Sequence, residues 1–152
     1  MATRGERTYR KNVGMIVINN EKKFLICQRA DNNHWQFPQG GVDNGETHID
    51  ALFRELNEEI GTVHVKVIAS TDHLYTYDWP PHIMARDNFK GQSQRYYLLK
   101  FTGEDADIRI DQREFQSWQW INKEDLIKTV EPVRLPIYKK VLEEFEKELN
   151  NI

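Results

Sequence analysis

The chain has 152 residues, of which 39% are hydrophobic and 30% charged, and its formal net charge is −3 at pH 7. This length predicts a single domain over residues 1–152, and the composition argues against disorder and against a uniformly basic nucleic-acid binder. The single cysteine, Cys27, excludes a disulfide framework and a cysteine-rich zinc site. No apolar run could span a bilayer and no apolar stretch follows the N-terminal charges, so we expect a cytoplasmic protein with no membrane partner.

The first third of the chain predicts two strands and a long loop. Residues 13–18 form an almost unbroken apolar run, which is typical of a strand covered on both faces. A turn separates this run from a second predicted strand at residues 23–28. Residues 31–45 are rich in Asn, Gln, Pro and Gly, and they predict a long loop of the kind that often carries function.

A helix is predicted directly after this loop. Thr47 can cap its N-terminus, with Asp50 three residues later, and Gly61 suits the position just past its C-terminus. Apolar residues recur at helical spacing, at Ile49, Leu52, Phe53, Leu56 and Ile60. This stripe predicts the face of the helix that packs against the rest of the fold.

The remainder of the chain predicts shorter strands and a final helix. The predicted strands lie at residues 63–67, 74–77 and 96–101 and around Trp118 and Trp120. Residues 72–94 also contain many turn residues and predict a second long loop, and Pro136 can open a last helix. Because strands and helices interleave without a regular repeat, the predicted fold class is α/β, with a mixed sheet and helices on both of its faces.

Three glutamates crowd one side of the predicted first helix. At about 100° per residue, Glu55, Glu58 and Glu59 point into one arc that lies away from the apolar stripe. A solvated acidic face is the ordinary explanation. However, the helix dipole disfavours anions in the last turn, and these like charges repel one another with only Arg54 nearby to offset them. Cation binding would explain the cluster, and oxygen ligands suit Mg²⁺ or Mn²⁺.

Such a cation site points to phosphate chemistry. Mg²⁺ held by carboxylates usually keeps waters and takes phosphate oxygens as its remaining ligands. It can polarise a phosphoryl group and lower the pKa of a bound water, and a nearby carboxylate can accept the proton of that water. The residues alone therefore indicate metal-assisted attack of water on a phosphoanhydride.

The same segment resembles the Nudix box, in which fixed spacings separate a glycine, a glutamate and an Arg-Glu pair. The matching residues are Gly40, Glu46, Arg54, Glu55, Leu56, Glu58, Glu59 and Gly61. Thr62 departs from the pattern because it stands where the family has an aliphatic residue, which concerns packing and not chemistry. The resemblance implies an α/β/α sandwich in which the box forms a loop–helix–loop metal site.

The resemblance also implies roles for individual residues. The implied metal ligands, for two or three Mg²⁺ ions with Mn²⁺ as a possible substitute, are Gly40, Glu55, Glu58, Glu59 and Glu114. Glu55 is implied as a ligand or as the general base, and it forms the catalytic set together with Glu58 and Arg54. Arg54 and Glu46 would orient the carboxylates. Without the resemblance, Glu114 would be read as a solvated loop charge.

The segments that flank the box resemble the bacterial RNA pyrophosphohydrolases within this family. They lie at residues 9–14, 35–41, 91–97, 114–120 and 132–134. These enzymes remove pyrophosphate from a 5′-triphosphorylated RNA end and leave a monophosphate, which promotes mRNA decay. Two alternatives stay open: a dinucleoside polyphosphate hydrolase, and a module that binds nucleotides without cleaving them. Monomer and homodimer also stay open.

A nucleoside polyphosphate or a triphosphorylated RNA end requires positive and aromatic side chains around the cations. The candidate substrate-binding residues are Arg10, Arg29, His34, Gln39, Gln92, Arg95, Tyr138 and Lys139. Arginine binds phosphate through parallel hydrogen bonds, although each arginine could equally be a surface charge. The resemblance implies that Tyr138 stacks on a base opposite Arg29, with its ring emerging at the rim of its helix. Packing of Tyr138 in the core is the rival interpretation.

Overall fold

The computed structural model describes residues 7–84 and 88–152. The strands are β1 (Tyr9–Ile18), β2 (Phe24–Arg29), β3 (Trp35–Gln36), β4 (Gln39–Gly41), β5 (Val65–Ser70), β6 (Tyr75–Asp78), β7 (Gly91–Phe101) and β8 (Phe115–Ile121). The helices are α1 (His48–Ile60), α2 (Pro81–Met84), the 3₁₀ turn η2 (Asp105–Asp107), α3 (Lys123–Thr129), α4 (Leu135–Glu144) and α5 (Glu146–Asn150). None of the helices in these two ranges is both long and apolar enough to cross a membrane.

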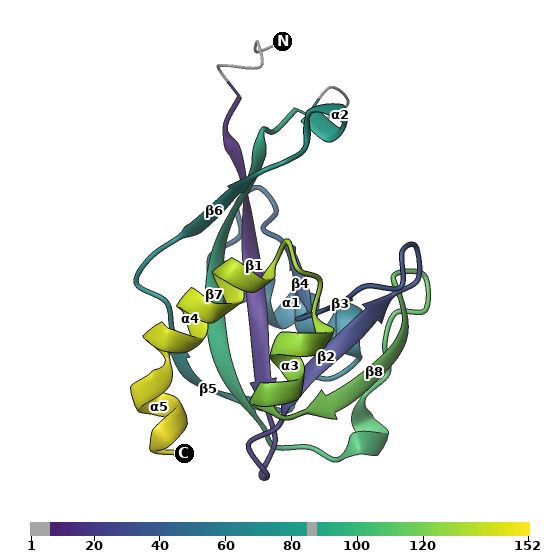
Figure 1. Cartoon of the computed structure of the whole chain (residues 1–152), viewed down its shortest axis with the longest axis vertical. Coiled ribbons are helices and arrows are strands. Elements are labelled where there is room, and N and C mark those ends of the chain that lie inside the picture. The colour runs from purple at the N-terminus through teal and green to yellow at the C-terminus, as the bar shows by residue number, and fades with distance from the viewer. Residues whose placement is uncertain (1–6, 85–87) are drawn as a thin grey trace.

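All the strands join one mixed sheet, as the sequence predicts. The order along its main path is β3-β2-β1-β7-β5, while β4 pairs with β1, β6 with β7 and β8 with β2 (Figure 1). β1 and β7 run parallel, from Tyr9 opposite Gly91 to Ile18 opposite Lys100. The other strand pairs are antiparallel. β1 therefore lies at the centre of the sheet, and its buried residues face a core on each side.

Helices cover both faces of this sheet. Val13 and Met15 of β1 belong to the core beneath α1, whereas Ile16 and Ile18 belong to the core beneath α3 and α4. In Figure 1, α1 lies behind the sheet while α3 and α4 lie in front of it. The predicted α/β sandwich with helices on both faces is confirmed. We call the two sides of the sheet the α1 face and the α4 face.

The caps of α1 form as the sequence predicts. The Thr47 hydroxyl oxygen accepts a hydrogen bond from the backbone N–H of Asp50 at 3.2 Å. Gly61 adopts a φ of +73° just past the helix and donates its N–H to Asn57. A side chain at Gly61 would also place its Cβ 2.6 Å from the backbone oxygen of Arg109. Local sequence thus sets both ends of the helix that carries the glutamates.

The burial of α1 differs from the prediction in two respects. The apolar stripe is only partly covered, because Ile49 and Phe53 are 40% and 36% exposed. Conversely, Glu55 and Glu59 are 7% and 6% exposed, although they were expected to lie away from the packed side. The helix is therefore rotated so that two carboxylates enter the layer between α1 and the sheet.

Several elements also differ from the predictions in extent. β1 begins at Tyr9 and β7 at Gly91, earlier than expected, because the two strands pair with each other along their whole length. The predicted loop at 31–45 contains the short strands β3 and β4. The predicted strand at 63–67 begins only at Val65, and α2 and α3 were not predicted. The last helix is divided at Phe145 into α4 and α5.

Candidate active site

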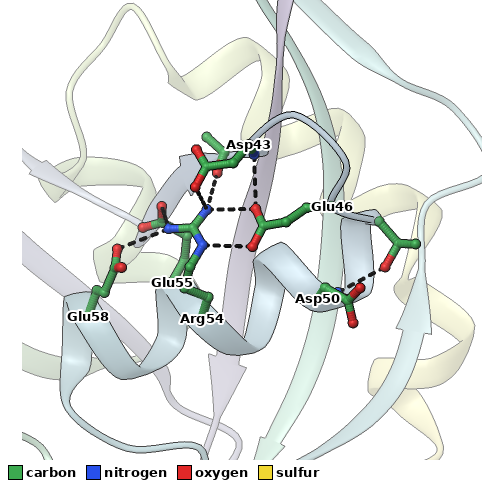
Figure 2. Close-up of polar contacts among 8 residues, drawn as sticks. Asp43, Glu46, Asp50, Arg54, Glu55 and Glu58 are labelled. Atoms are coloured by element: carbon green, nitrogen blue, oxygen red, sulfur yellow. Dashed lines mark hydrogen bonds and ion pairs between the residues drawn. The ribbon is translucent and has the colours of Figure 1, made fainter.

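Arg54 lies at the centre of a network that joins the loop before α1 to the helix itself (Figure 2). Its Nε and Nη2 atoms donate to the two carboxylate oxygens of Glu46 at 2.8 and 2.9 Å. Nη1 donates to Glu55 at 2.8 Å and to Glu58 at 3.1 Å, and Nη2 donates to the carbonyl oxygen of Gly41 at 2.8 Å. One guanidinium group therefore fixes three glutamates and the loop backbone, as the predicted orienting role requires.

Glu46 completes this Arg54 network on the loop side. Its carboxylate also accepts the backbone N–H of Asp43 at 2.9 Å. The hydrogen bonds from Arg54, followed by that from Asp43, lower the pKa of Glu46 to about 2. Glu46 is thus an anion at neutral pH, and its contacts with Arg54 link the loop to the helix.

Glu55 packs directly against the glycine of the loop strand β4. A Cβ atom at Gly40 would lie 2.0 Å from the Glu55 carboxyl carbon, so any larger residue there would displace the Glu55 side chain. Burial raises the pKa of Glu55, while the adjacent Arg54 guanidinium acts in the opposite direction. Gly40 and Glu55 were both predicted as site residues, and the structure brings them into contact.

Glu59 and Glu114 form a second group of crowded carboxylates. Burial raises the pKa of Glu59 to about 10, with further contributions from the neighbouring carboxyl groups of Glu114 and Glu55. Glu114 lies just before β8, where its backbone oxygen accepts the N–H of Ala30 at 2.8 Å. The structure thus brings Glu114 to the glutamates of α1 from a distant part of the sequence, as expected.

These carboxylates do not yet form a complete ligand set. Within residues 7–84 and 88–152, no three Asp, Glu, His or Cys side chains are grouped as a metal site, and Arg54 binds both Glu55 and Glu58. Glu59 Oε2 is buried without a hydrogen-bond partner in the described part of the chain. The arrangement therefore holds one buried carboxyl oxygen, on Glu59, that no hydrogen bond within the described residues satisfies.

Two cavities lie near this site and share Arg29. One, of about 430 Å³, is lined by Arg29, Asp31, Asp111, Arg113 and Glu114. The other, of about 520 Å³, lies on the α4 face, and its lining includes Arg29, Trp79, Tyr96, Val133, Arg134 and Tyr138. The first is polar and adjoins the carboxylates, whereas the second is mainly apolar. Arg29 therefore stands between a charged compartment and a compartment of a size suited to a nucleobase.

Comparison with known proteins identifies the family. The profile of the NUDIX domain matches residues 8–143. The chain belongs to the Nudix family. Among its relatives, the RNA pyrophosphohydrolase of Orientia tsutsugamushi (strain Boryong) is 41% identical over 144 residues, which cover 90% of this chain and 89% of that protein. The RNA pyrophosphohydrolase of a Wolbachia pipientis strain is 40% identical, with 92% and 91% covered. These matches indicate a pyrophosphohydrolase.

Solved structures of other Nudix proteins support the fold. The Ap4A hydrolase of C. elegans, in a binary complex, has a TM-score of 0.72 at 25% identity and covers 94% of this chain and 99% of its own. The E. coli dihydroneopterin triphosphate pyrophosphohydrolase also has a TM-score of 0.72, at 17% identity, with 96% and 100% covered. The second likeness concerns the fold alone.

Tyr138 does not emerge at the rim of the Nudix fold, so that expectation is wrong. It is 2% exposed, and its ring packs against Phe37 and Tyr96 at centroid distances of 4.5 and 6.4 Å. Its hydroxyl oxygen accepts the backbone N–H of Phe37 at 3.1 Å. The ring is held in the core of the α4 face by apolar contact and by this hydrogen bond. Tyr138 only borders the larger cavity.

Two of the predicted arginines lie close to the Nudix loop and the cavities. Arg29 donates to both carboxylate oxygens of Asp31, at 2.9 and 2.8 Å. The guanidinium of Arg10 lies against Gly41, where a Cβ atom would be 2.4 Å from Arg10 Nη2. Gly41 also accepts a hydrogen bond from Arg54, so Arg10 adjoins the Arg54 network.

The structure separates Arg95 and Lys139 from the cavities. Arg95 lies opposite Val13 on the α1 face and donates to the backbone oxygen of Thr71 at 2.8 Å. Lys139 is exposed on α4 and lines neither cavity. Neither residue is therefore among those that line the two cavities that Arg29 borders.

The other predicted polar contacts are engaged within the protein. His34 lies 4.0 Å from Glu131, which borders the larger cavity. Gln92 accepts a hydrogen bond from the Tyr77 hydroxyl group. These two residues lie near the cavity wall without lining it together with Arg29.

Gln39 is the end of a chain of hydrogen bonds that the sequence did not reveal. Tyr96 donates its hydroxyl to Gln94 at 2.8 Å, Gln94 donates to Asn12 at 2.9 Å, and Asn12 donates to Gln39 at 2.6 Å. Asn12 and Gln94 are both 1% exposed. The signal for them is weak, because each is a polar residue whose partner lies on another strand. The chain leaves the amide N–H groups of Gln39 available beside the Nudix loop.

Proposed function

We propose that this Nudix hydrolase removes pyrophosphate from 5′-triphosphorylated RNA and leaves a 5′-monophosphate, which promotes mRNA decay. The observation that carries the proposal is the group of carboxyl groups in which the buried Glu55 and Glu59 of α1 meet the half-buried Glu114. Carboxyl groups crowded in a buried layer, where Arg54 pairs with Glu55, are unfavourable as anions, so the group is explained if cations bind to it.

The residues fit divalent cations such as Mg²⁺ or Mn²⁺. The orphaned Oε2 of Glu59 and the close approach of Gly40 to Glu55 leave oxygen ligands available in a buried layer. Glu55, Glu58, Glu59, Glu114 and the Gly40 carbonyl would hold two or three ions. Binding would require Glu59 to lose its proton, while Glu55 and Glu58 each have a second carboxylate oxygen besides the one that Arg54 contacts. Cations bound there would polarise the phosphoanhydride and lower the pKa of a bound water.

The side chains of the chain itself would place and activate the reacting groups. Glu55 is proposed as the base that accepts the proton of the attacking water, because it is buried and oriented by Arg54. Glu46 holds Arg54, and through it Glu58, in a fixed position. Both orienting contacts exist before substrate arrives, so little reorganisation is required at the moment of reaction.

The two cavities suggest how an RNA end would lie. Phosphates would occupy the polar cavity beside Glu114, and the first base would enter the apolar cavity on the α4 face. Arg29 borders both cavities and would contact the phosphates at their junction. Arg10 and the free amide of Gln39 would contribute further donors near Gly41.

Product analysis on end-labelled triphosphorylated RNA tests this proposal. The wild-type protein with Mg²⁺ should release pyrophosphate, or phosphate in steps, and leave a monophosphorylated end. Glu55→Gln and Glu58→Gln should each lower turnover by several orders of magnitude and leave the circular dichroism spectrum unchanged. The matched control is Glu143→Gln, an exposed glutamate of α4, which should retain turnover. Near-normal turnover of either site variant would refute the assignment.

A dinucleoside polyphosphate hydrolase is the second candidate. It is favoured by the likeness to the Ap4A hydrolase of C. elegans, whose fold superimposes over 94% of this chain. Competition between triphosphorylated RNA and diadenosine polyphosphates, measured as kcat/KM, distinguishes the two. If neither substrate is cleaved with Mg²⁺ or Mn²⁺, the chain is a binding module, and the proposed hydrolase activity is wrong.

A further inference from the structure

Gln36 of β3 is a fully buried glutamine without hydrogen bonds from its side chain. It is 0% exposed, and within the described part of the chain neither Nε2 nor Oε1 has a partner. Buried side-chain amides are nearly always paired, so an unpaired one requires an explanation. An apolar side chain of the same size would fill this position without leaving polar atoms unpaired.

The strand register places Gln36 on the α1 face. It lies directly opposite Cys27 of β2, which belongs to the core beneath α1. Its neighbours Trp35 and Phe37 belong to the opposite core, as the alternation of a strand requires. Gln36 therefore points into the same layer as the buried carboxylates.

Contacts on both sides of Gln36 lead to those carboxylates. The adjacent Cys27 belongs to the core that packs beneath α1, and its thiol has its pKa raised first by burial and then by the carboxyl groups of Glu59 and Glu114. Further along the same segment, Gly40 touches Glu55. Gln36 lies beside Cys27 and shortly before β4, the strand that packs against α1.

A third unpaired atom lies in this layer. Glu59 Oε2 is buried and also has no partner among residues 7–84 and 88–152. A side-chain amide offers N–H donors and an acceptor oxygen. A carboxylate oxygen needs a donor, and a water bound to a cation needs an acceptor. The unpaired Nε2 and Oε1 atoms of Gln36 therefore match the hydrogen-bonding needs of Glu59 Oε2 and of such a water.

We propose that Gln36 is a positioning residue for the cation site, where its N–H group orients Glu59 and its carbonyl oxygen accepts a hydrogen bond from water held at the site. The inference rests on the proposed metal-dependent function. It means that β3, which lies outside the Nudix box, supplies a residue that helps to hold the metal ligands in position.

Gln36→Leu tests the proposal because stability and cation binding should change in opposite directions. Without metal, the variant should unfold at a higher temperature than the wild type, since two unpaired polar atoms are removed. Calorimetric titration with Mn²⁺ alone should give a dissociation constant at least tenfold larger than that of the wild type. If Gln36 only filled the core, the variant would change stability and leave the Mn²⁺ dissociation constant at the wild-type value. Gln36→Met, with a flexible side chain of similar volume, provides the same comparison if the leucine variant does not fold.

Gln94→Leu is the matched control on the opposite face of the sheet. Gln94 is equally buried but fully engaged with Asn12 and Tyr96. This variant should unfold at a lower temperature and bind Mn²⁺ with the wild-type constant. If Gln36→Leu and Gln36→Met bind Mn²⁺ as the wild type does, the inference is wrong and the proposed function stands. If the wild type binds no Mn²⁺, the proposed function itself fails.

Discussion

At the scale of single residues, Glu59 is held in its neutral form by its surroundings. Burial and the nearby carboxyl groups of Glu114 and Glu55 raise its pKa to about 10. A carboxyl group whose pKa is higher in the folded than in the unfolded state stabilises the fold below the unfolded pKa. That contribution is lost as the pH rises toward 10, because deprotonation leaves a buried charge.

The stability of the metal-free protein should therefore depend on pH through Glu59. Glu59→Gln keeps the neutral shape at every pH, so in EDTA it should unfold at a temperature about 3 °C or more above the wild type at pH 9. Near pH 4.5 the difference should vanish. Thermal unfolding between pH 4.5 and 9 measures it, with the exposed Glu143→Gln as control. Parallel curves for wild type and Glu59→Gln would contradict the raised pKa.

Arg54 is the residue whose geometry a lysine cannot reproduce. It donates in parallel to Glu46 and separately to Glu55 and Glu58. Arg54→Lys keeps the charge but loses the planar set of donors, so kcat should fall about 100-fold while the fold persists. Steady-state kinetics with triphosphorylated RNA measures this, and Arg109→Lys, at an exposed position, is the control. Unchanged kcat would mean that charge alone suffices.

At the scale of elements, α1 owes its ends to local sequence and its position to its neighbours. Both caps were predictable from Thr47 and Gly61, because capping depends on residues within one helical turn. The rotation that buries Glu55 and Glu59 was not predictable. It depends on Gly40, which allows the helix to approach β4 closely, and that contact spans distant positions in the sequence.

Gly45, in the loop before α1, and Gly61, just past the end of α1, provide a paired test of stability. Gly61 has a φ of +73° and a Cβ there would meet the backbone of Arg109, whereas Gly45 has a φ of +84° and open space around it. Gly45→Ala should cost about 1 kcal/mol from strain alone, and Gly61→Ala should cost more because a clash is added. Urea denaturation measures both. Equal losses would show that the clash is relieved without cost.

The extent of the strands depends more on pairing with distant strands than on local sequence. The apolar part of β1 was predictable from residues 13–18, but its first residues are polar and extended only because β7 pairs with them. The short strands β3 and β4 lie in a segment whose composition is that of a loop. Their hydrogen bonds come from β2 and β1, so the segment alone carries no sign of them.

At the scale of the whole molecule, the sheet separates two kinds of environment. The carboxylates lie on the α1 face, while the apolar cavity lies on the α4 face. The box was predictable because its motif is long and fixed in spacing, whereas Glu114 and Arg29 were predicted from the family resemblance alone. The sequence did not reveal Gln36, Asn12 or Gln94, because their significance arises from pairing between strands.

The position of Cys27 has a practical consequence for studying motion in this enzyme. It is the chain's single thiol, is fully buried, and lies in the core beneath α1. A thiol reagent can reach it only when the layer between α1 and the sheet opens, so the labelling rate records that opening without any introduced probe. Bound Mn²⁺ should slow the labelling in proportion to its occupancy. If labelling is equally fast with and without the ion, opening and cation binding are independent events.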